Sequence, residues 1–472
     1  LYVSSSLGVT KRSGKLFDRI SKSEGVPADK IHHYGDNAHS DFNVPKRLGV
    51  QATLLSDAQL NQWEQALCGT EPKMASSLLA GSMRSFRLNN SSDSPESICA
   101  LVGTFLGPIA MVWAAWLLGA ARRDGVRRLY FASRDGNLVW HAARMLSPQF
   151  GDIDCRYLKV SRQAVLLPSV KQISPSEIPW LFRPWELAEM DRLLQKLGLN
   201  WAEVSSSFET LANGQGRRKI LDGKEDLNEF WKVLQTSTVK DLLLARIEER
   251  RKAALAYFEA EGLGDEIPSG FVDLGWFLTV QTALRKLLGG REGKSRLRGY
   301  YLGVSPDRLA RSEAGDTTAL FYGNAPDRRE LVRDAAIFRR IDILEHIIGL
   351  APHGTVHEYR FVEGVAEPVC RAIRSDYADS VRDVERAVRA FCRIHPDAES
   401  FADEHVARST IDVLIKTWCG SPSEGALKLL QHVRAGRDQN NLDDRRLVEP
   451  WRLWEAAKVL LPGRLQRAFD LK

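Results

Sequence analysis

The chain has 472 residues, of which 44% are hydrophobic and 27% charged, and this composition excludes an intrinsically disordered protein. It is too long for one ordinary hydrophobic core, so two or three domains are expected. The formal net charge of +6 is dispersed along the chain, without the dense basic stripe of a nucleic-acid-binding surface. We therefore expect no nucleic-acid partner.

The cysteines are widely spaced, and the sequence contains no Cys-x-x-Cys pair. This spacing favours free thiols in a reducing compartment over disulfides or a zinc site. The expectation is a cytoplasmic protein with six unpaired cysteines: Cys68, Cys99, Cys155, Cys370, Cys392 and Cys419.

Residues 1–58 alternate between short apolar runs, typical of strands, and helical stretches. Such alternation predicts a parallel sheet. The expected elements are a strand over Leu1–Ser5, a helix over Ser13–Glu24, a strand over Ile31–Tyr34, a helix over Ser40–Leu48 and a strand over Val50–Leu55.

Polar loops follow the first two of these strands. Lys11 comes after the first strand, and Asp36 and Asp41 follow the second on a loop that begins at Gly35. Ligands of open parallel sheets bind at the carboxyl ends of the strands, so these three side chains are expected to meet. Mg²⁺ takes a few carboxylate oxygens and completes its octahedron with water and phosphate. The loops therefore predict a magnesium site.

The same loops resemble the third and fourth motifs of the haloacid dehalogenase-like phosphohydrolases, through Ser5, Gly8, Lys11, Gly14–Phe17, Gly35, Asp36 and Asp41. In that family a lysine steadies the aspartyl nucleophile and the transferring phosphoryl group. The resemblance implies a Rossmann-like sheet with Lys11 as a catalytic residue. It implies Asp36 and Asp41 as Mg²⁺ ligands, and Ser5 and Asn37 as substrate contacts.

Two departures from that family matter for function. Arg12 stands where the family usually has proline after the motif lysine. The family's nucleophile belongs to an Asp-x-Asp motif on an earlier strand, and covalent phosphoryl transfer needs that carboxylate. Since the chain begins at Leu1, already inside the third motif, we expect it to be a fragment carrying half of an active site.

A long apolar segment follows a helix expected near Asp57–Leu67 and a polar linker around residues 89–95. Residues 98–121 carry no charge and are long enough for a membrane span of about 20 residues. Proline favours the first turn of a helix, so we expect a break before Pro108 and a buried helix over Pro108–Ala121. No stable membrane insertion is expected, although proline and glycine also occur in true spans.

A second α/β domain with a helical insertion is expected over residues 98–360, after the helix and linker of residues 59–97. The insertion covers Ser174–Ala256. The expected strands are Leu129–Ser133, Arg156–Val160, Gly270–Trp276, Arg298–Val304 and Ala319–Tyr322. Residues 361–472 are expected to be helical, with helices over Val381–Phe391, Phe401–Trp418, Ala426–Val433 and Trp451–Leu461.

Three strand ends of this second domain carry polar residues that form a second candidate site. They are Arg134 with Asp135, then Arg162, and then Asp273 with Gln281. Arginines at helix N-termini suit a phosphorylated or carboxylated ligand. An alternative stays open: Arg134–Asp135 is simply an N-terminal helix cap, and Asp273 caps the helix after Gly275.

Most of the chain also resembles the large two-part predicted haloacid dehalogenase-like hydrolases of bacterial surface-polysaccharide gene clusters, often encoded beside glycosyltransferases. The residues that carry this second resemblance are Phe131–Gly136, Val160–Arg162, Val272–Trp276, Gln281, Leu344–Glu345 and Ala351–Gly354. The resemblance identifies a family and not the reaction of its second domain.

The leading hypothesis is a Mg²⁺-dependent phosphohydrolase that acts on a sugar phosphate or a glycan-linked phosphate. A second hypothesis makes residues 1–58 a degraded scaffold beside a sugar-phosphate-binding or glycan-transferring domain. A third is a non-catalytic partner of a glycosyltransferase. Four histidines are left outside the candidate sites because isolated histidines are usually structural: His32, His33, His346 and His353.

Overall fold

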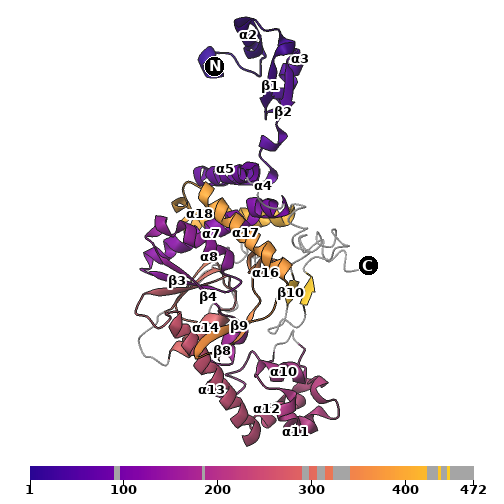
Figure 1. Cartoon of the computed structure of the whole chain (residues 1–472), viewed down its shortest axis with the longest axis vertical. Helices are drawn as coiled ribbons and strands as arrows, with labels where there is room; N and C mark the ends of the chain where they lie inside the picture. The colour runs from indigo at the N-terminus through magenta and orange to yellow at the C-terminus, as the bar shows by residue number, and fades with distance from the viewer. Residues whose placement is uncertain are drawn as a thin grey trace.

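A computed structural model describes residues 1–89, 96–182, 187–289, 297–305, 314–322, 341–422, 434–436 and 444–446. The protein has an α/β fold with a five-stranded parallel sheet, three two-stranded sheets in the described part, and many helices (Figure 1). The helices expected over Ala426–Val433 and Trp451–Leu461 lie outside the described residues.

The N-terminal unit is a two-stranded parallel sheet with helices beside it, and it projects from the rest of the molecule (Figure 1). Its core is small, and the cluster of buried apolar side chains consists of Phe17, Val44 and Val50. Its elements are α1 (Ser4–Leu7), α2 (Lys15–Glu24), β1 (His32–Gly35), the π-helical turn η2 (Ala38–Asn43), α3 (Val44–Arg47) and β2 (Gln51–Leu54).

The strand expected over Leu1–Ser5 is wrong, because Ser4–Leu7 forms the one-turn helix α1. Serine is a poor strand former, so the serine run gives little drive toward a sheet. Gly8 then ends the turn with φ of +64°, a conformation that glycine adopts without strain.

A helical layer connects the N-terminal unit to the large sheet. It contains α4 (Gln62–Cys68), α5 (Lys73–Asn89), α6 (Glu96–Leu101), the π-helical segment η4 (Val102–Leu106) and α7 (Gly107–Arg123). The break expected before Pro108 is wrong, since helix continues through η4 into α7. A π-helical turn widens the helix where proline cannot donate a hydrogen bond.

The continuous helix over Ile98–Arg123 is long and apolar enough to cross a membrane by composition, yet 94% of its most apolar window is buried inside the protein. Trp113 and Trp116 are fully enclosed. The segment therefore lies in the protein core. The buried helix that the sequence predicts over Pro108–Ala121 is part of it.

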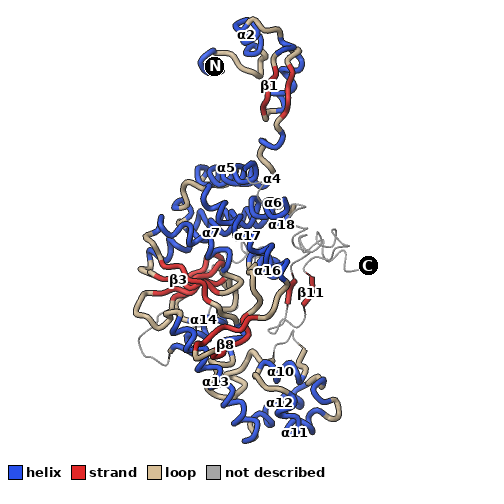
Figure 2. Tube along the Cα trace, viewed as in Figure 1, coloured by secondary structure: helices blue, strands red, loops and turns tan. Residues whose placement is uncertain are grey.

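The large sheet, drawn in red around β3 in Figure 2, has the strand order β4-β3-β5-β6-β7, and every neighbouring pair is parallel. Its five strands overlap the five that the sequence predicts: β3 (Arg128–Ala132), β4 (Asp154–Leu158), β5 (Ser269–Asp273), β6 (Arg298–Gly303) and β7 (Thr317–Phe321). The order reverses at β3, because β4 lies on one side of it and β5 on the other. Such a reversal opens a crevice at the carboxyl ends of the strands.

Both faces of the sheet are covered, as is usual for a parallel sheet. Along β3, Leu129 and Phe131 join one hydrophobic cluster, whereas Tyr130 and Ala132 join another. The first cluster is covered by α7, α8 (Asn137–Leu146), α17 (Ser375–Ile394) and α18 (Glu404–Gly420). The second is covered by α9 (Arg162–Leu166), α13 (Ser237–Ala260), α14 (Thr279–Leu288) and the hairpin of β8 (Val356–Val362) and β9 (Val365–Cys370).

The insertion between β4 and β5 is helical, in agreement with the sequence. Besides α9 and α13 it contains α10 (Met190–Lys196), α11 (Trp201–Ala212) and α12 (Gly223–Leu234). The described part also contains α16 (Ile341–Ile348), the short strands β10 (Arg434–Gly436) and β11 (Asp444–Arg446), and several short 3-10 helices.

The expectation that residues 361–472 are helical is wrong at its start, because β8 and β9 form an antiparallel hairpin there. Glu363 and Gly364 both have positive φ, +51° and +85°. Two such residues make the type I′ turn that fits the twist of a two-residue hairpin. The helices expected over Val381–Phe391 and Phe401–Trp418 are present as α17 and α18.

Candidate functional site

In the N-terminal unit, the carboxylate of Asp41 collects three donors. Lys11 Nζ lies 2.5 Å from Asp41 Oδ1, and His33 Nε2 lies 3.1 Å from the same oxygen. The backbone N–H of Asn37 donates to Oδ2 at 3.1 Å. Burial by itself would raise the pKa of Asp41, but these contacts together lower it below its ordinary value. Two of the three predicted residues, Lys11 and Asp41, are therefore in direct contact.

The loop after β1 is shaped by close packing against Asp41. A Cβ atom at Gly35 would lie 2.5 Å from Asp41 Cβ, so only glycine fits at that position. Asn37 caps η2, since its side-chain oxygen accepts from the backbone N–H groups of His39 and Ser40. The side chain of Asn37 thus has a local structural role.

Asp36 and Ser5 lie outside the Lys11–Asp41 contact. The Asp36 side chain is half exposed and lies 3.6 Å from Arg84 Nη2 of α5. Ser5 is exposed on α1. In the described parts of the chain, no group of three or more His, Cys, Asp or Glu side chains has an arrangement that holds a metal ion. The Asp36 carboxylate is half exposed, whereas both Asp41 oxygens already face hydrogen-bond donors.

A second set of predicted residues meets in a cavity of about 120 Å³ at the carboxyl ends of β3, β4 and β5. Arg134 and Asp135 enter it from the end of β3, Arg162 from the start of α9, and Asp273 from the end of β5. The cavity lies where the strand order reverses, the usual ligand position in open parallel sheets. The sequence predicts these four residues at strand ends, and the fold brings them together.

The turn after β3 holds Arg134 in an uncommon conformation, with φ of +70°. Non-glycine residues rarely adopt positive φ, and such strain is concentrated at functional sites. Gly136 lets the chain fold back on its own strand, because a Cβ atom there would lie 2.7 Å from the Ala132 carbonyl oxygen. The turn leads directly into α8.

The turn after β5 also depends on glycine. Gly275 has φ of +143°, and a Cβ atom there would lie 2.0 Å from the Gly303 carbonyl oxygen. This approach of backbone to backbone fixes the start of α14, whose residues Thr279 and Val280 line the cavity. Helix N-termini present free N–H groups that favour anions.

The acids of the cavity have perturbed titration. Burial raises the pKa of Asp135, and the nearby guanidinium groups of Arg134 and Arg162 offset part of that rise. Asp273 is 8% exposed, and one of its oxygens accepts from the Leu274 N–H at 2.8 Å. Burial, followed by the negative charge of Asp135, raises its pKa well above the ordinary value. Perturbed acids in a cavity of mixed charge mark a candidate site for binding or proton transfer.

Gln281 belongs to the interior rather than to the cavity. It is fully buried, and its amide donates to the carbonyl oxygens of Leu297 and Asp316 at 3.2 and 3.3 Å. Its side-chain oxygen accepts from the Tyr301 hydroxyl. Gln281 therefore ties α14 to the sheet.

Several site residues were missed from the sequence. Glu345, His346 and Thr355 also line the cavity, although they come from a part of the chain remote from the strand ends. His33 was set aside, yet it contacts Asp41. The alternation of side chains along a strand could have predicted this contact. It directs His32 toward Thr53 and His33 to the opposite side, where Asp41 lies.

No protein-family model matches the chain, and no curated protein matches it.

Proposed function

We propose that the cavity at the carboxyl ends of β3, β4 and β5 binds a phosphorylated small molecule. The resemblance to polysaccharide-cluster hydrolases favours a cytoplasmic sugar phosphate or glycan-linked phosphate. The observation that carries the proposal is the meeting of Arg134, Asp135, Arg162 and Asp273 in one cavity.

The chemistry of the lining supports this ligand class. Arginine matches phosphate oxygens with two parallel donors and stays charged at every physiological pH. Arg134 and Arg162 supply that charge beside the N-terminus of α14. Asp135 and Asp273 are acceptors, or donors when protonated, of the kind that sugar hydroxyls need. A ligand that carries both a phosphate and hydroxyls would use the arginines and the acids of the cavity.

Calorimetric titration with a hexose 1-phosphate tests the proposal, with the unphosphorylated hexose as the ligand control. Arg162→Met should weaken hexose 1-phosphate binding about 10- to 100-fold, because a charged hydrogen bond is lost. Arg382→Met removes an exposed arginine of α17 and should leave the affinity unchanged. Equal affinity for hexose and hexose 1-phosphate, or no effect of Arg162→Met, would contradict phosphate recognition here.

We further propose that the open reading frame containing this chain encodes a Mg²⁺-dependent phosphohydrolase of the haloacid dehalogenase type. The 2.5 Å contact between Lys11 and Asp41 favours it, because it holds the ammonium group at the edge of the β1–β2 sheet. Asp36 would hold Mg²⁺, which supplies charge neutralisation for phosphoryl transfer. Lys11 would orient the phosphoryl oxygens, with Asp41 fixing its position.

A phosphatase assay of that reading frame with p-nitrophenyl phosphate tests this second function. Turnover should require Mg²⁺ and should fall at least 100-fold in Asp36→Asn. Asp29→Asn, at an exposed acid of the same unit, is the matched control. Turnover that survives Asp36→Asn would remove the hydrolase. If ligand binding in the cavity at β3, β4 and β5 is also absent, a non-catalytic partner of a glycosyltransferase becomes the better account.

A further inference from the structure

Residues 350–355 contact both ends of the strained turn after β3. Asn137, the first residue of α8, donates its side-chain amide to the Leu350 carbonyl oxygen at 2.9 Å. Arg134 Nη1 donates to Thr355 Oγ1 at 2.6 Å. Both ends of the turn are thus fastened to the same stretch of chain.

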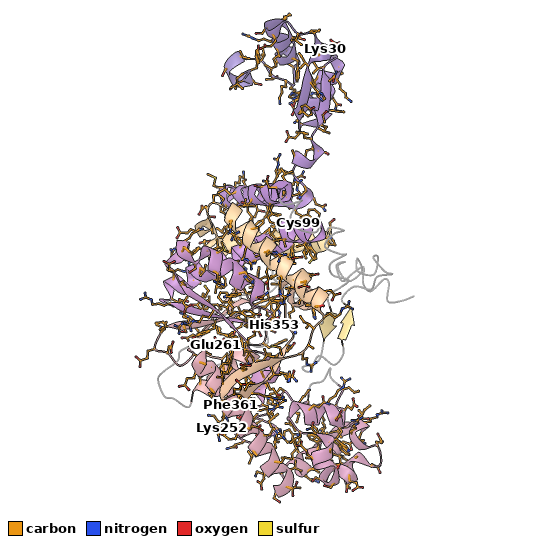
Figure 3. The ribbon with its side chains drawn as sticks, in the orientation of Figure 1. Lys30, Cys99, Lys252, Glu261, His353 and Phe361 are labelled. Atoms are coloured by element: carbon orange, nitrogen blue, oxygen red, sulfur yellow. The ribbon has the colours of Figure 1, made fainter. Side chains whose placement is uncertain are left out.

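A third contact reaches the backbone of the turn itself. The N–H of Arg134 donates to the hydroxyl oxygen of Tyr157, at 2.8 Å, from β4. The Tyr157 hydroxyl lies 2.8 Å from His353 Nε2, and His353 Nδ1 lies 2.8 Å from the Gly354 carbonyl oxygen. His353 lies in the main part of the molecule, away from the projecting N-terminal unit (Figure 3).

The direction of every hydrogen bond in this relay is determined. A carbonyl oxygen only accepts, so His353 Nδ1 carries a proton and donates it to Gly354. Nε2 of the neutral ring then accepts, and the Tyr157 hydroxyl donates to it. Because that hydroxyl gives its one proton to His353, its oxygen remains an acceptor for the Arg134 N–H. A protonated His353 would present a donor to the Tyr157 oxygen, so the Tyr157–His353 hydrogen bond would reverse and the hydroxyl would lose its acceptor.

We propose that Tyr157 and His353 are positioning residues that hold Arg134 in its left-handed conformation and so aim Arg134 and Asp135 into the ligand cavity. This inference rests on the proposed phosphate-binding function. Neither residue lines the cavity, so each acts on the ligand through the turn.

The surroundings of His353 keep its ring neutral. Burial lowers the pKa of His353 to about 4 despite the hydrogen bond to Gly354. The nearby cations Lys159 and Arg134 contribute to this lowered pKa, while Glu385 of α17 acts in the opposite sense. The Tyr157 hydroxyl therefore donates to His353 above about pH 5, and this hydrogen bond reverses as the pH falls through about 4.

Two measurements on the full chain test the positioning role: calorimetric titration with inorganic phosphate, and hydrogen–deuterium exchange of the peptide that contains Arg134. Tyr157→Phe keeps the ring beside Trp140 but removes the hydroxyl. It should weaken phosphate binding at least 10-fold and speed exchange of that peptide. Tyr300 lies in β6 of the same sheet, and its hydroxyl donates to Asp124. Tyr300→Phe removes that hydroxyl and should change neither measurement.

A conservative variant of His353 and a double variant distinguish a positioning role from a general loss of stability. His353→Gln retains an acceptor for Tyr157 and should bind phosphate within about 3-fold of the wild type at pH 7, whereas His353→Leu should lose at least 10-fold. Tyr157→Phe combined with His353→Leu should cost no more affinity than either alone, since both break one relay.

The outcomes distinguish this inference from the proposed function. No phosphate binding by the wild type overturns the function and the positioning role together. Wild-type binding that Tyr157→Phe leaves unchanged overturns only the positioning role, as does equal loss in His353→Gln and His353→Leu.

Discussion

Burial of Asp273 makes the stability of the folded chain depend on pH. Its carboxyl group is buried beside Asp135, and its raised pKa means that the folded chain holds this proton more tightly than the unfolded chain. Stability from this group is therefore present at low pH and is lost as the pH rises from the unfolded pKa through the folded pKa. A residue kept at such a cost is a candidate for function.

Asp273→Asn should remove this pH dependence. At pH 7 the variant should be more stable than the wild type by about 0.5–2 kcal/mol, and the difference should vanish near pH 4. Urea unfolding across that range measures it. Asp152→Asn, at an exposed acid, is the control. A variant less stable than the wild type at pH 7 would show that the folded state favours the ionised carboxylate.

Gly349 packs closely against the side chain of Asp135. A Cβ atom there would lie 2.7 Å from Asp135 Oδ1 and 2.4 Å from the Glu345 carbonyl oxygen. Gly349→Ala should therefore displace Asp135 and weaken hexose 1-phosphate binding about 10- to 100-fold. Gly81→Ala, where a Cβ atom meets nothing within 4 Å, should bind normally. Unchanged affinity in a folded Gly349→Ala variant would remove Asp135 from the site.

At the scale of elements, the parallel direction of the strands explains why the sequence could predict the second site. Strands β3, β4 and β5 were recognisable as short apolar runs, and their carboxyl ends share an edge in any parallel arrangement. Arg134, Asp135 and Asp273 could therefore be placed together. Thr355 and His346 could not, because no local pattern says where a remote helix or segment will pack.

The elements that were mispredicted have local physical causes. Strand β8 was missed because the turn at Glu363 and Gly364 was not recognised as a hairpin. The break expected at Pro108 was absent because a π-helical turn accommodates the proline. At Ser4–Leu7, an apolar start suggested a strand that the serine run does not sustain.

Helix α7 should behave as a core element. Trp116 is fully enclosed, and within the described residues its indole N–H has no hydrogen-bond partner. Trp116→Ala should destabilise the chain by about 3–5 kcal/mol, measured by urea unfolding. Trp116→Phe should cost much less, since it keeps most of the apolar contact and removes the unpaired N–H. Equal, small effects would place this face of α7 outside the core.

For the whole molecule, the two candidate sites belong to separate cores. The N-terminal unit, which projects from the rest of the molecule in Figure 1, has its own small apolar cluster, and the cavity lies at the large sheet. Deleting residues 1–58 should therefore leave hexose 1-phosphate affinity within about twofold of the full chain, provided that circular dichroism shows a folded remainder. A folded remainder that has lost its affinity would mean that the N-terminal unit completes the binding site.

Hydrogen–deuterium exchange with hexose 1-phosphate tests the central assignment most directly, because it reports where the ligand acts. The cavity assignment predicts slower exchange in peptides covering residues 132–137, 160–164 and 273–280, with no change in the loop over residues 35–41. Slower exchange confined to residues 35–41, or no change anywhere at a saturating ligand concentration, would contradict it.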